Sequence, residues 1–159
     1  MDSTDARCLL IDVDRISRKL EQAARRGGPE APDTIGKLRL ELAMATTRYL
    51  SAVKEQFCDP LMQQGSEGRA LVTEYMARAR DSRRIVAAHQ MRWTAARTKA
   101  DWAGYCTAII EFSALFAERR LWELNSFLPK AQQLLAWIPP AGREAPCSGL
   151  ENAYEPRQQ

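Results

Sequence analysis

The side chains of this sequence that could do chemistry are few and widely separated. The chain has a single histidine, His89, and four cysteines without a CxxC pair. Neither a Ser/His/Asp nor a Cys/His arrangement can be built from local spacing, and no glycine-rich phosphate loop is present. We therefore expect no catalytic residue, no bound metal and no cofactor, and we expect the cysteines to be reduced thiols.

His89 has two interpretations. It lies two helical turns beyond Ser82 on one face of a predicted helix, so its imidazole could look into the interior. A lone histidine on a helix is usually a partly buried, hydrogen-bonded side chain. A ligand or acid–base role is the alternative, and the sequence leaves both open.

Arg119 and Glu123 are the most suggestive charged pair. They continue an apolar stripe through Phe112 and Phe116 by steps of three and four, so both could point partly inward. The i, i+4 spacing lets them pair on one helix, and a buried charge needs such a partner. The alternative is an exposed pair at the helix edge. We expect Phe112 and Phe116 themselves to lie in the core.

The elements that position these groups are long segments with an apolar period near 3.6 residues. Strands are not expected, because valine, isoleucine and threonine are sparse and never alternate with polar residues. We expect Asp33 and Ser66 to be helix N-caps. Inward positions include Leu50 and Ile85. The predicted helices cover about residues 4–26, 33–58, 66–97, 99–127 and 130–137.

Short connections between these helices favour antiparallel neighbours. The expected fold is all-α: an antiparallel up-down-up-down four-helix bundle with a short C-terminal helix. Residues 1–138 would form the bundle, and residues 139–159, rich in proline, glycine and charge, a flexible tail. The absence of a long apolar run and the acidic first residues favour a cytoplasmic protein without a membrane span.

The chain also divides into two similar half-units. Ile16 lies 44 residues before Pro60 and Ile85 lies 44 residues before Pro129, so the half-units are offset by 69 residues and each ends at a proline. Their second helices read YLSAVKEQFCDPLM and FAERRLWELNSFLPKA. This layout resembles the hemerythrin-like (HHE cation-binding) family over about residues 5–138. Its members are four-helix bundles built from two helix pairs.

The resemblance implies a layer of metal ligands, and the chain departs from the family there. The family has a histidine three residues before the aliphatic position of the first and third helices, and HxxxE-type pairs on the second and fourth. The corresponding positions hold Val13, Leu50, Lys54, Ser82, Arg119 and Glu123. Of these only Glu123 has a carboxylate, although Glu55 could replace Lys54 if the register slips by one. One histidine cannot supply a di-iron site. We expect Arg119 and Glu123 to fill the space of the metal.

These observations predict a non-enzymatic, metal-free hemerythrin-like bundle that acts as an interaction or regulatory module of bacterial type. One alternative is a small-molecule-binding or sensor bundle, since the small Val13 and Ser82 could leave an interior cavity for an apolar ligand. Another is a divergent metal- or oxygen-binding protein. The expected partner is a protein or a second copy, and a net charge of +3 does not indicate nucleic acid. The candidate interaction surface comprises Arg80, Arg83, Arg84 and Trp137.

Overall fold

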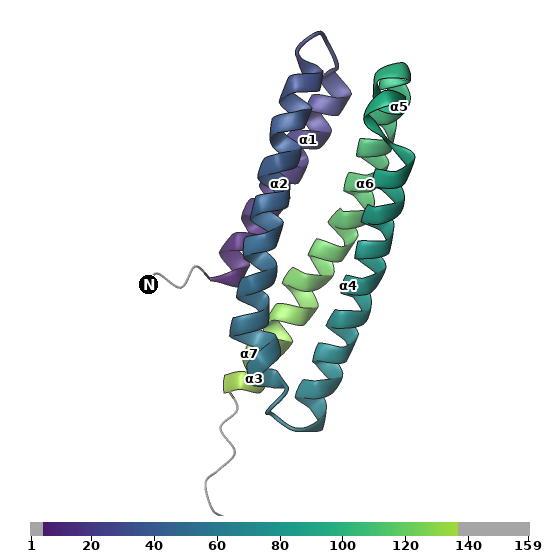
Figure 1. Cartoon of the computed structure of the whole chain (residues 1–159). Helices are drawn as coiled ribbons and strands as arrows, with labels where there is room; N and C mark the ends of the chain where they lie inside the picture. Colours follow the sequence, from purple (N-terminus) through teal and green to yellow (C-terminus); the bar gives the residue numbers. More distant parts are fainter. Residues whose placement is uncertain (1–4, 137–159) are drawn as a thin grey trace, which may run out of the picture.

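The computed structural model describes residues 5–136, and every regular element in that range is a helix (Figure 1). The predicted all-α class is therefore confirmed, whereas the predicted tail and Trp137 lie outside the described residues. The helices are α1 (Ala6–Arg26), α2 (Ala31–Val53), α3 (Asp59–Leu61), α4 (Ser66–Arg92), α5 (Ala95–Ala100), α6 (Trp102–Trp122) and α7 (Leu128–Ala136). Two π-helical turns, η1 (Lys54–Cys58) and η2 (Glu123–Phe127), interrupt the second and last long helices.

The two prolines do not end their helices, contrary to the sequence prediction. Helix continues through Pro60 to Leu61, and through Pro129 to Ala136. Proline lacks an N–H and its ring clashes with the carbonyl four residues earlier, and a π-turn before it changes that local geometry. In both turns a backbone N–H bonds five residues back, from Asp59 to Lys54 and from Leu128 to Glu123.

The third predicted helix is also divided. α4 ends at Arg92, and the separate α5 begins after Thr94, whose hydroxyl accepts from the Arg97 N–H. α6 begins at Trp102, because the Asp101 side chain accepts from the Gly104 N–H and caps it. The sequence period alone did not detect these capping residues.

The two predicted N-caps were wrong by a few residues. α2 has Glu30 as its N-cap and a proline in its first turn, which leaves Asp33 inside the helix near its positive end. α4 has Gly65 as its N-cap, with a φ of 89° that favours glycine, and Ser66 is the first helical residue.

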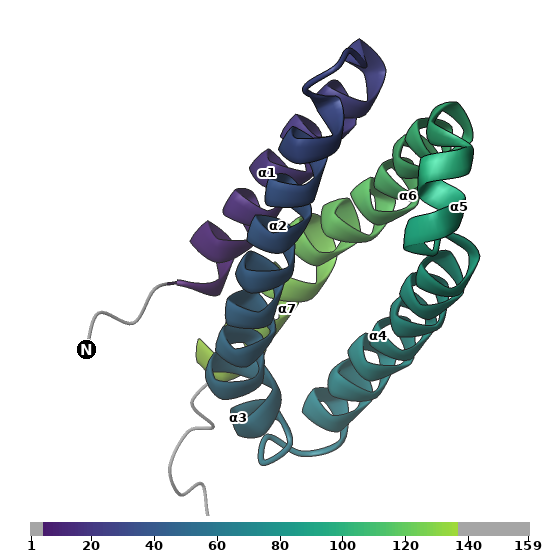
Figure 2. The same cartoon turned by 45° about the horizontal axis from the view of Figure 1, so that its top comes forward.

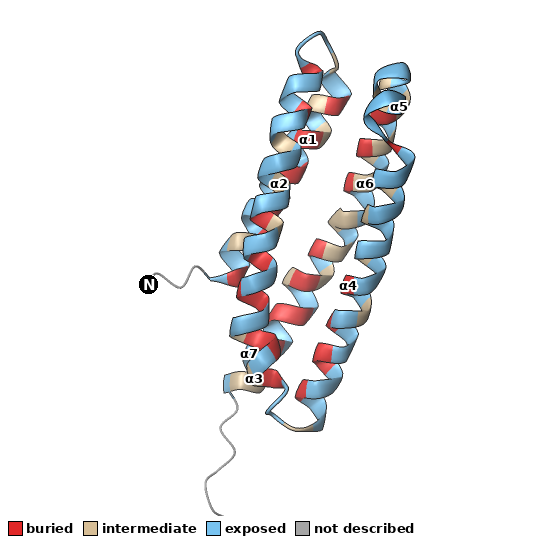
Figure 3. Ribbon diagram, in the orientation of Figure 1, coloured by how far each residue is buried: buried red, intermediate tan, exposed pale blue. Residues whose placement is uncertain are grey.

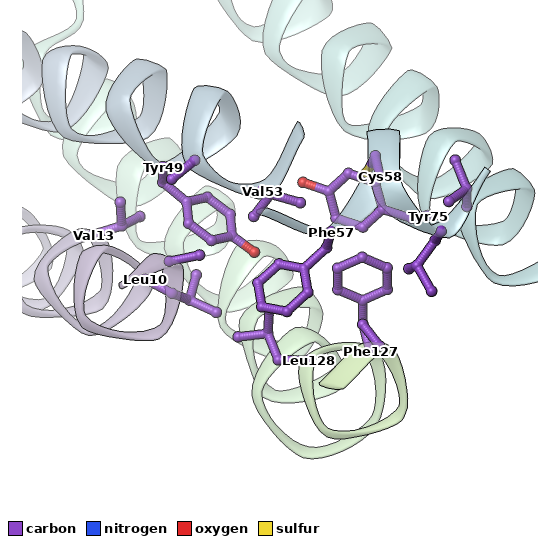
Figure 4. Packing of buried hydrophobic residues seen from close by; sticks show 14 of the residues in the cluster. Leu10, Val13, Tyr49, Val53, Phe57, Cys58, Tyr75, Phe127 and Leu128 are labelled. Atoms are coloured by element: carbon purple, nitrogen blue, oxygen red, sulfur yellow. The ribbon is translucent and has the colours of Figure 1, made fainter. Parts of the chain in front are cut away.

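The main core cluster joins α1 and the second half of α2 to η1, α3, the start of α4, η2 and α7 (Figure 3). Phe127 has no exposed surface, stacks on Tyr75 with a centroid distance of 4.5 Å, and meets the edge of Phe57 (Figure 4). A second cluster around Ile35, Trp93 and Tyr105 closes the opposite end. The two helix pairs are therefore packed together at both ends of the molecule and less closely in the middle.

Two predicted inward positions are wrong. Leu50 is 43% exposed and Ile85 is also exposed, although Ile16, the counterpart of Ile85 in the first half-unit, is buried. Phe112 and Phe116 are half-buried rather than in the core. Within residues 5–136 no helix is long and apolar enough to cross a membrane.

Candidate ligand-binding pocket

A pocket of about 740 Å³ lies between the two helix pairs, within the roughly 300–1,000 Å³ that small-molecule sites occupy. Its lining comes from α1, α2, α4 and α6 and includes Glu123 at the start of η2. Leu40 and Leu50 on α2, and Arg83 and Gln90 on α4, are exposed lining residues. The pocket therefore opens to solvent between α2 and α4, which face each other in Figure 2.

The pocket exists because the second half of α4 is poorly buried. The buried residues of α4 within its own bounds end at Ala79. The following stretch, residues 80–92, is rich in arginine; a few of its side chains, such as Val86 and His89, are half-buried and the others are exposed. With few large apolar side chains, this stretch gains little by packing onto α2.

The walls are mostly apolar. Phe112 and Phe116 of α6 lie side by side, with ring centroids 4.6 Å apart, and both line the pocket. Phe112 and Phe116 are half-buried because one side of each ring faces the pocket. Further apolar lining residues are Leu10, Val13, Leu20, Leu40, Leu42, Leu50, Val86 and Ile109.

One side of the pocket carries a buried ion pair. The Arg119 Nε donates to Glu123 Oε1 over 2.8 Å, and their side chains are 15% and 3% exposed. This confirms the inward alternative for the pair. The Tyr49 hydroxyl donates to Glu123 Oε2 over 3.0 Å. Two side chains, Tyr49 of α2 and Arg119 of α6, thus share the Glu123 carboxylate of η2.

Arg119 also connects α6 to α4. Its Nη1 donates to the Ser82 hydroxyl and, over 3.1 Å, to the Arg78 carbonyl oxygen. The Arg78 guanidinium lies over the Trp122 ring, 4.1 Å from its centroid. The expected layer residues Ser82, Arg119 and Glu123 are therefore brought together as a hydrogen-bonded network.

Two tyrosines complete this region. Burial and the nearby Glu123 carboxylate raise the pKa of Tyr49 and of Tyr75, so both stay as phenols at neutral pH. The Tyr75 hydroxyl is buried without a hydrogen-bond partner within residues 5–136. In Figure 4 the hydroxyls of Tyr49 and Tyr75 point toward the same interior space.

A second buried ion pair joins α6 to α1. Arg120 is 8% exposed, lines the pocket, and its Nε donates to Asp14 Oδ1 of α1 over 2.9 Å. Their sequence separation gives no local signal for the contact. Only the phase of α6, which places both Arg119 and Arg120 toward neighbouring helices, could have suggested it.

The opposite end of the pocket contains His89. Its ring lies 4.7 Å from Phe112 and 6.2 Å from Tyr105, measured between centroids. Burial, followed by the positive charges of Arg39 and Arg92, lowers the pKa of His89. The imidazole is therefore neutral at neutral pH, which fits the half-buried aromatic setting.

The first half-unit contributes differently to the expected layer. Val13 is buried in the pocket wall, and Leu50 lies at the opening. Lys54 points to solvent and pairs with Asp59 at 2.6 Å, and Glu55 is also exposed, so neither supplies the inward group that a one-residue slip would allow.

The candidate interaction surface is exposed where the structure describes it. Arg80, Arg83 and Arg84 are exposed on α4, and Arg84 pairs with Asp81 at 2.5 Å. Arg83 lines the pocket opening. The arginines of this surface are thus divided between an outer face and a pocket edge.

No group of three or more histidine, cysteine, aspartate or glutamate side chains gathers within the part of the chain that the structure describes. Cys8 is exposed, and burial raises the pKa of Cys58 to about 11.

No family model, curated protein or solved structure matches this chain.

Proposed function

We propose that this chain is a non-enzymatic four-helix bundle of hemerythrin-like layout whose pocket binds a small, elongated, mainly apolar molecule. The observation that carries the proposal is the pocket itself, with apolar walls and a few fixed polar groups. The two π-turns support the hemerythrin-like half-unit layout, because they are offset by the same 69 residues as the two prolines.

The arrangement of polar groups supports binding rather than catalysis. Arg119, Glu123 and Tyr49 already satisfy one another, and the raised pKa of Tyr49 keeps its proton on the phenol. A general base or nucleophile needs a free, suitably tuned group. His89, the neutral imidazole, has aromatic neighbours rather than an orienting carboxylate.

A pocket-filling variant tests the proposal. Val86 is half-buried and lines the pocket, whereas the adjacent Ile85 is exposed and does not line it. Val86→Trp should fill the opening, and Ile85→Trp adds the same ring outside. The probe is the neutral dye N-phenylnaphthylamine, whose fluorescence rises in apolar surroundings.

We expect saturable binding of one dye per wild-type chain, retained by Ile85→Trp and weakened about tenfold or more by Val86→Trp. Circular dichroism melting of all three proteins checks that they are folded. Equal binding by both tryptophan variants would place the dye elsewhere and contradict the proposal.

A second candidate function is association with a second copy, the interaction role expected from the sequence. It is supported by large apolar side chains exposed on α4, namely Met76, Ile85 and Met91. Sedimentation equilibrium tests it: a dimer weakened by Met91→Asp would support this role, and a strict monomer at high concentration would exclude it.

A further inference from the structure

The arginines that line the pocket outnumber its carboxylates. The pocket lining holds one carboxylate, Glu123, and the arginines Arg39, Arg83, Arg119 and Arg120. Glu123 forms an ion pair with Arg119, and Arg120 forms one with Asp14 of α1. Arg39 and Arg83 have no ion pair to any carboxylate within residues 5–136. The opening of the pocket therefore has an excess of positive charge.

Donors also exceed acceptors around Arg39. Its Nη1 donates to the Tyr105 hydroxyl oxygen over 2.7 Å, which leaves the Tyr105 O–H able to donate to a further group. Arg39, together with Arg92, also contributes to the lowered pKa of His89. This end of the pocket suits an anion.

The remainder of the pocket suits a hydrocarbon chain. At the other end the charges of Glu123 and Arg120 are neutralised by Arg119 and Asp14. The side chains between the two ends are the apolar walls described above. The α2 lining extends from Gly36 to Leu50, a helical length of about 21 Å at 1.5 Å per residue. The lining of α2 is thus long enough for an extended chain that starts at Arg39.

We propose that the ligand is an anionic amphiphile, a linear long-chain carboxylate whose head group lies against Arg39 and Tyr105 and whose chain follows the apolar walls. This inference rests on the proposed function and adds the chemical class of the ligand. The guanidinium offers a charge-assisted hydrogen bond, and Tyr105 can add a second donor.

The test compares three ligands of equal chain length: dodecanoate, dodecanol and dodecyltrimethylammonium, each below its aggregation concentration. Affinities come from displacement of N-phenylnaphthylamine from the full-length chain. The matched variants are Arg39→Gln and Arg48→Gln. Both arginines lie on α2 and are exposed, but Arg48 does not line the pocket.

We expect wild-type protein to bind dodecanoate about tenfold more tightly than dodecanol. Arg39→Gln should abolish this preference for dodecanoate, and Arg48→Gln should keep it. His89 is the only histidine, so its NMR titration is a unique reporter. Its pKa should be higher with dodecanoate bound than with dodecanol bound, because the carboxylate offsets the charge of Arg39.

Two results would overturn the inference while leaving the proposed function intact. One is equal affinity for dodecanoate and dodecanol. The other is tightest binding of dodecyltrimethylammonium. A failure of all three ligands and of the dye to bind would instead contradict the proposed function itself.

Discussion

The first half-unit, α1 with α2, and the second half-unit, α4 with α6, reach a π-turn at equivalent positions but bury very different side chains. α1 has buried residues from Ala6 to Ala24, along almost its whole length. α4 has none between Ala79 and its end at Arg92. The second half-unit instead buries a charged network of Arg119 and Glu123. Similar backbones thus hold a packed hairpin on one side and a polar pocket wall on the other.

The difference follows from residue types at equivalent positions. Where the second half-unit has Arg119 and Ser82, the first has Leu50 and Val13. A buried guanidinium and carboxylate require hydrogen-bonding partners in fixed places, and these partners come from α2 and α4. Apolar side chains carry no such requirement and can pack wherever there is space. The polar half-unit therefore sets the geometry of the pocket.

The largest expected effect contrasts the packed end with the pocket wall. Phe127→Ala should lower the free energy of unfolding by about 3–5 kcal/mol, because the ring is fully buried between Phe57 and Tyr75. Phe112→Ala should lower it less, by roughly 1–2 kcal/mol, because the ring is half-buried against the pocket. Urea unfolding measures both. Equal losses of unfolding free energy in the two variants would mean that Phe112 is packed in the core and does not line a pocket.

The next effect concerns the buried ion pair. Arg119→Leu gives the second half-unit the residue of the first, and it should cost about 3 kcal/mol because Glu123 is left buried without its cation. Adding Glu123→Met to this variant should recover most of the loss. The control is Lys54→Leu, which changes an exposed side chain and should leave the melting temperature unchanged. If the Arg119→Leu variant were as stable as wild type, burial of the Arg119–Glu123 pair would be disproved.

A smaller effect comes from exchanging the other equivalent pair. Ser82→Val removes an acceptor of Arg119 and should cost about 1 kcal/mol. Val13→Ser places a hydroxyl in an apolar wall and should cost about 1–2 kcal/mol. Thermal unfolding of the two variants and of their combination measures these terms. A stabilised Ser82→Val variant would show that the Arg119 network does not depend on α4.

The smallest effect is the pH dependence that His89 contributes. Because burial, Arg39 and Arg92 lower its folded pKa below the unfolded value near 6.5, the unfolded chain binds more protons in that region. Its contribution to stability is complete above the unfolded pKa and is lost as pH falls through the folded pKa. Wild type should therefore lose stability faster than His89→Phe on acidification below 6.5. Parallel pH curves for the two proteins would contradict a lowered pKa.

Helical periodicity predicted the all-α class and the main helices, because apolar stripes are local patterns. It misplaced the breaks after Arg92 and around the prolines, where capping side chains and i→i−5 bonds decide the geometry. The inward pair Arg119 and Glu123 could be proposed from their phase on the stripe. The Arg120–Asp14 pair, the Tyr49 donor and the Arg39–Tyr105 contact join distant segments, so no local pattern predicts them.

The most direct test of ligand binding in the pocket is a crystal structure of the full-length chain grown with saturating dodecanoate. We expect continuous electron density along the pocket between α2 and α4, with the carboxylate against Arg39 and Tyr105 and the chain beside Phe112 and Phe116. A structure in which α4 packs closely onto α2 and leaves no pocket would contradict this expectation, as would ligand density found only on the outer surface.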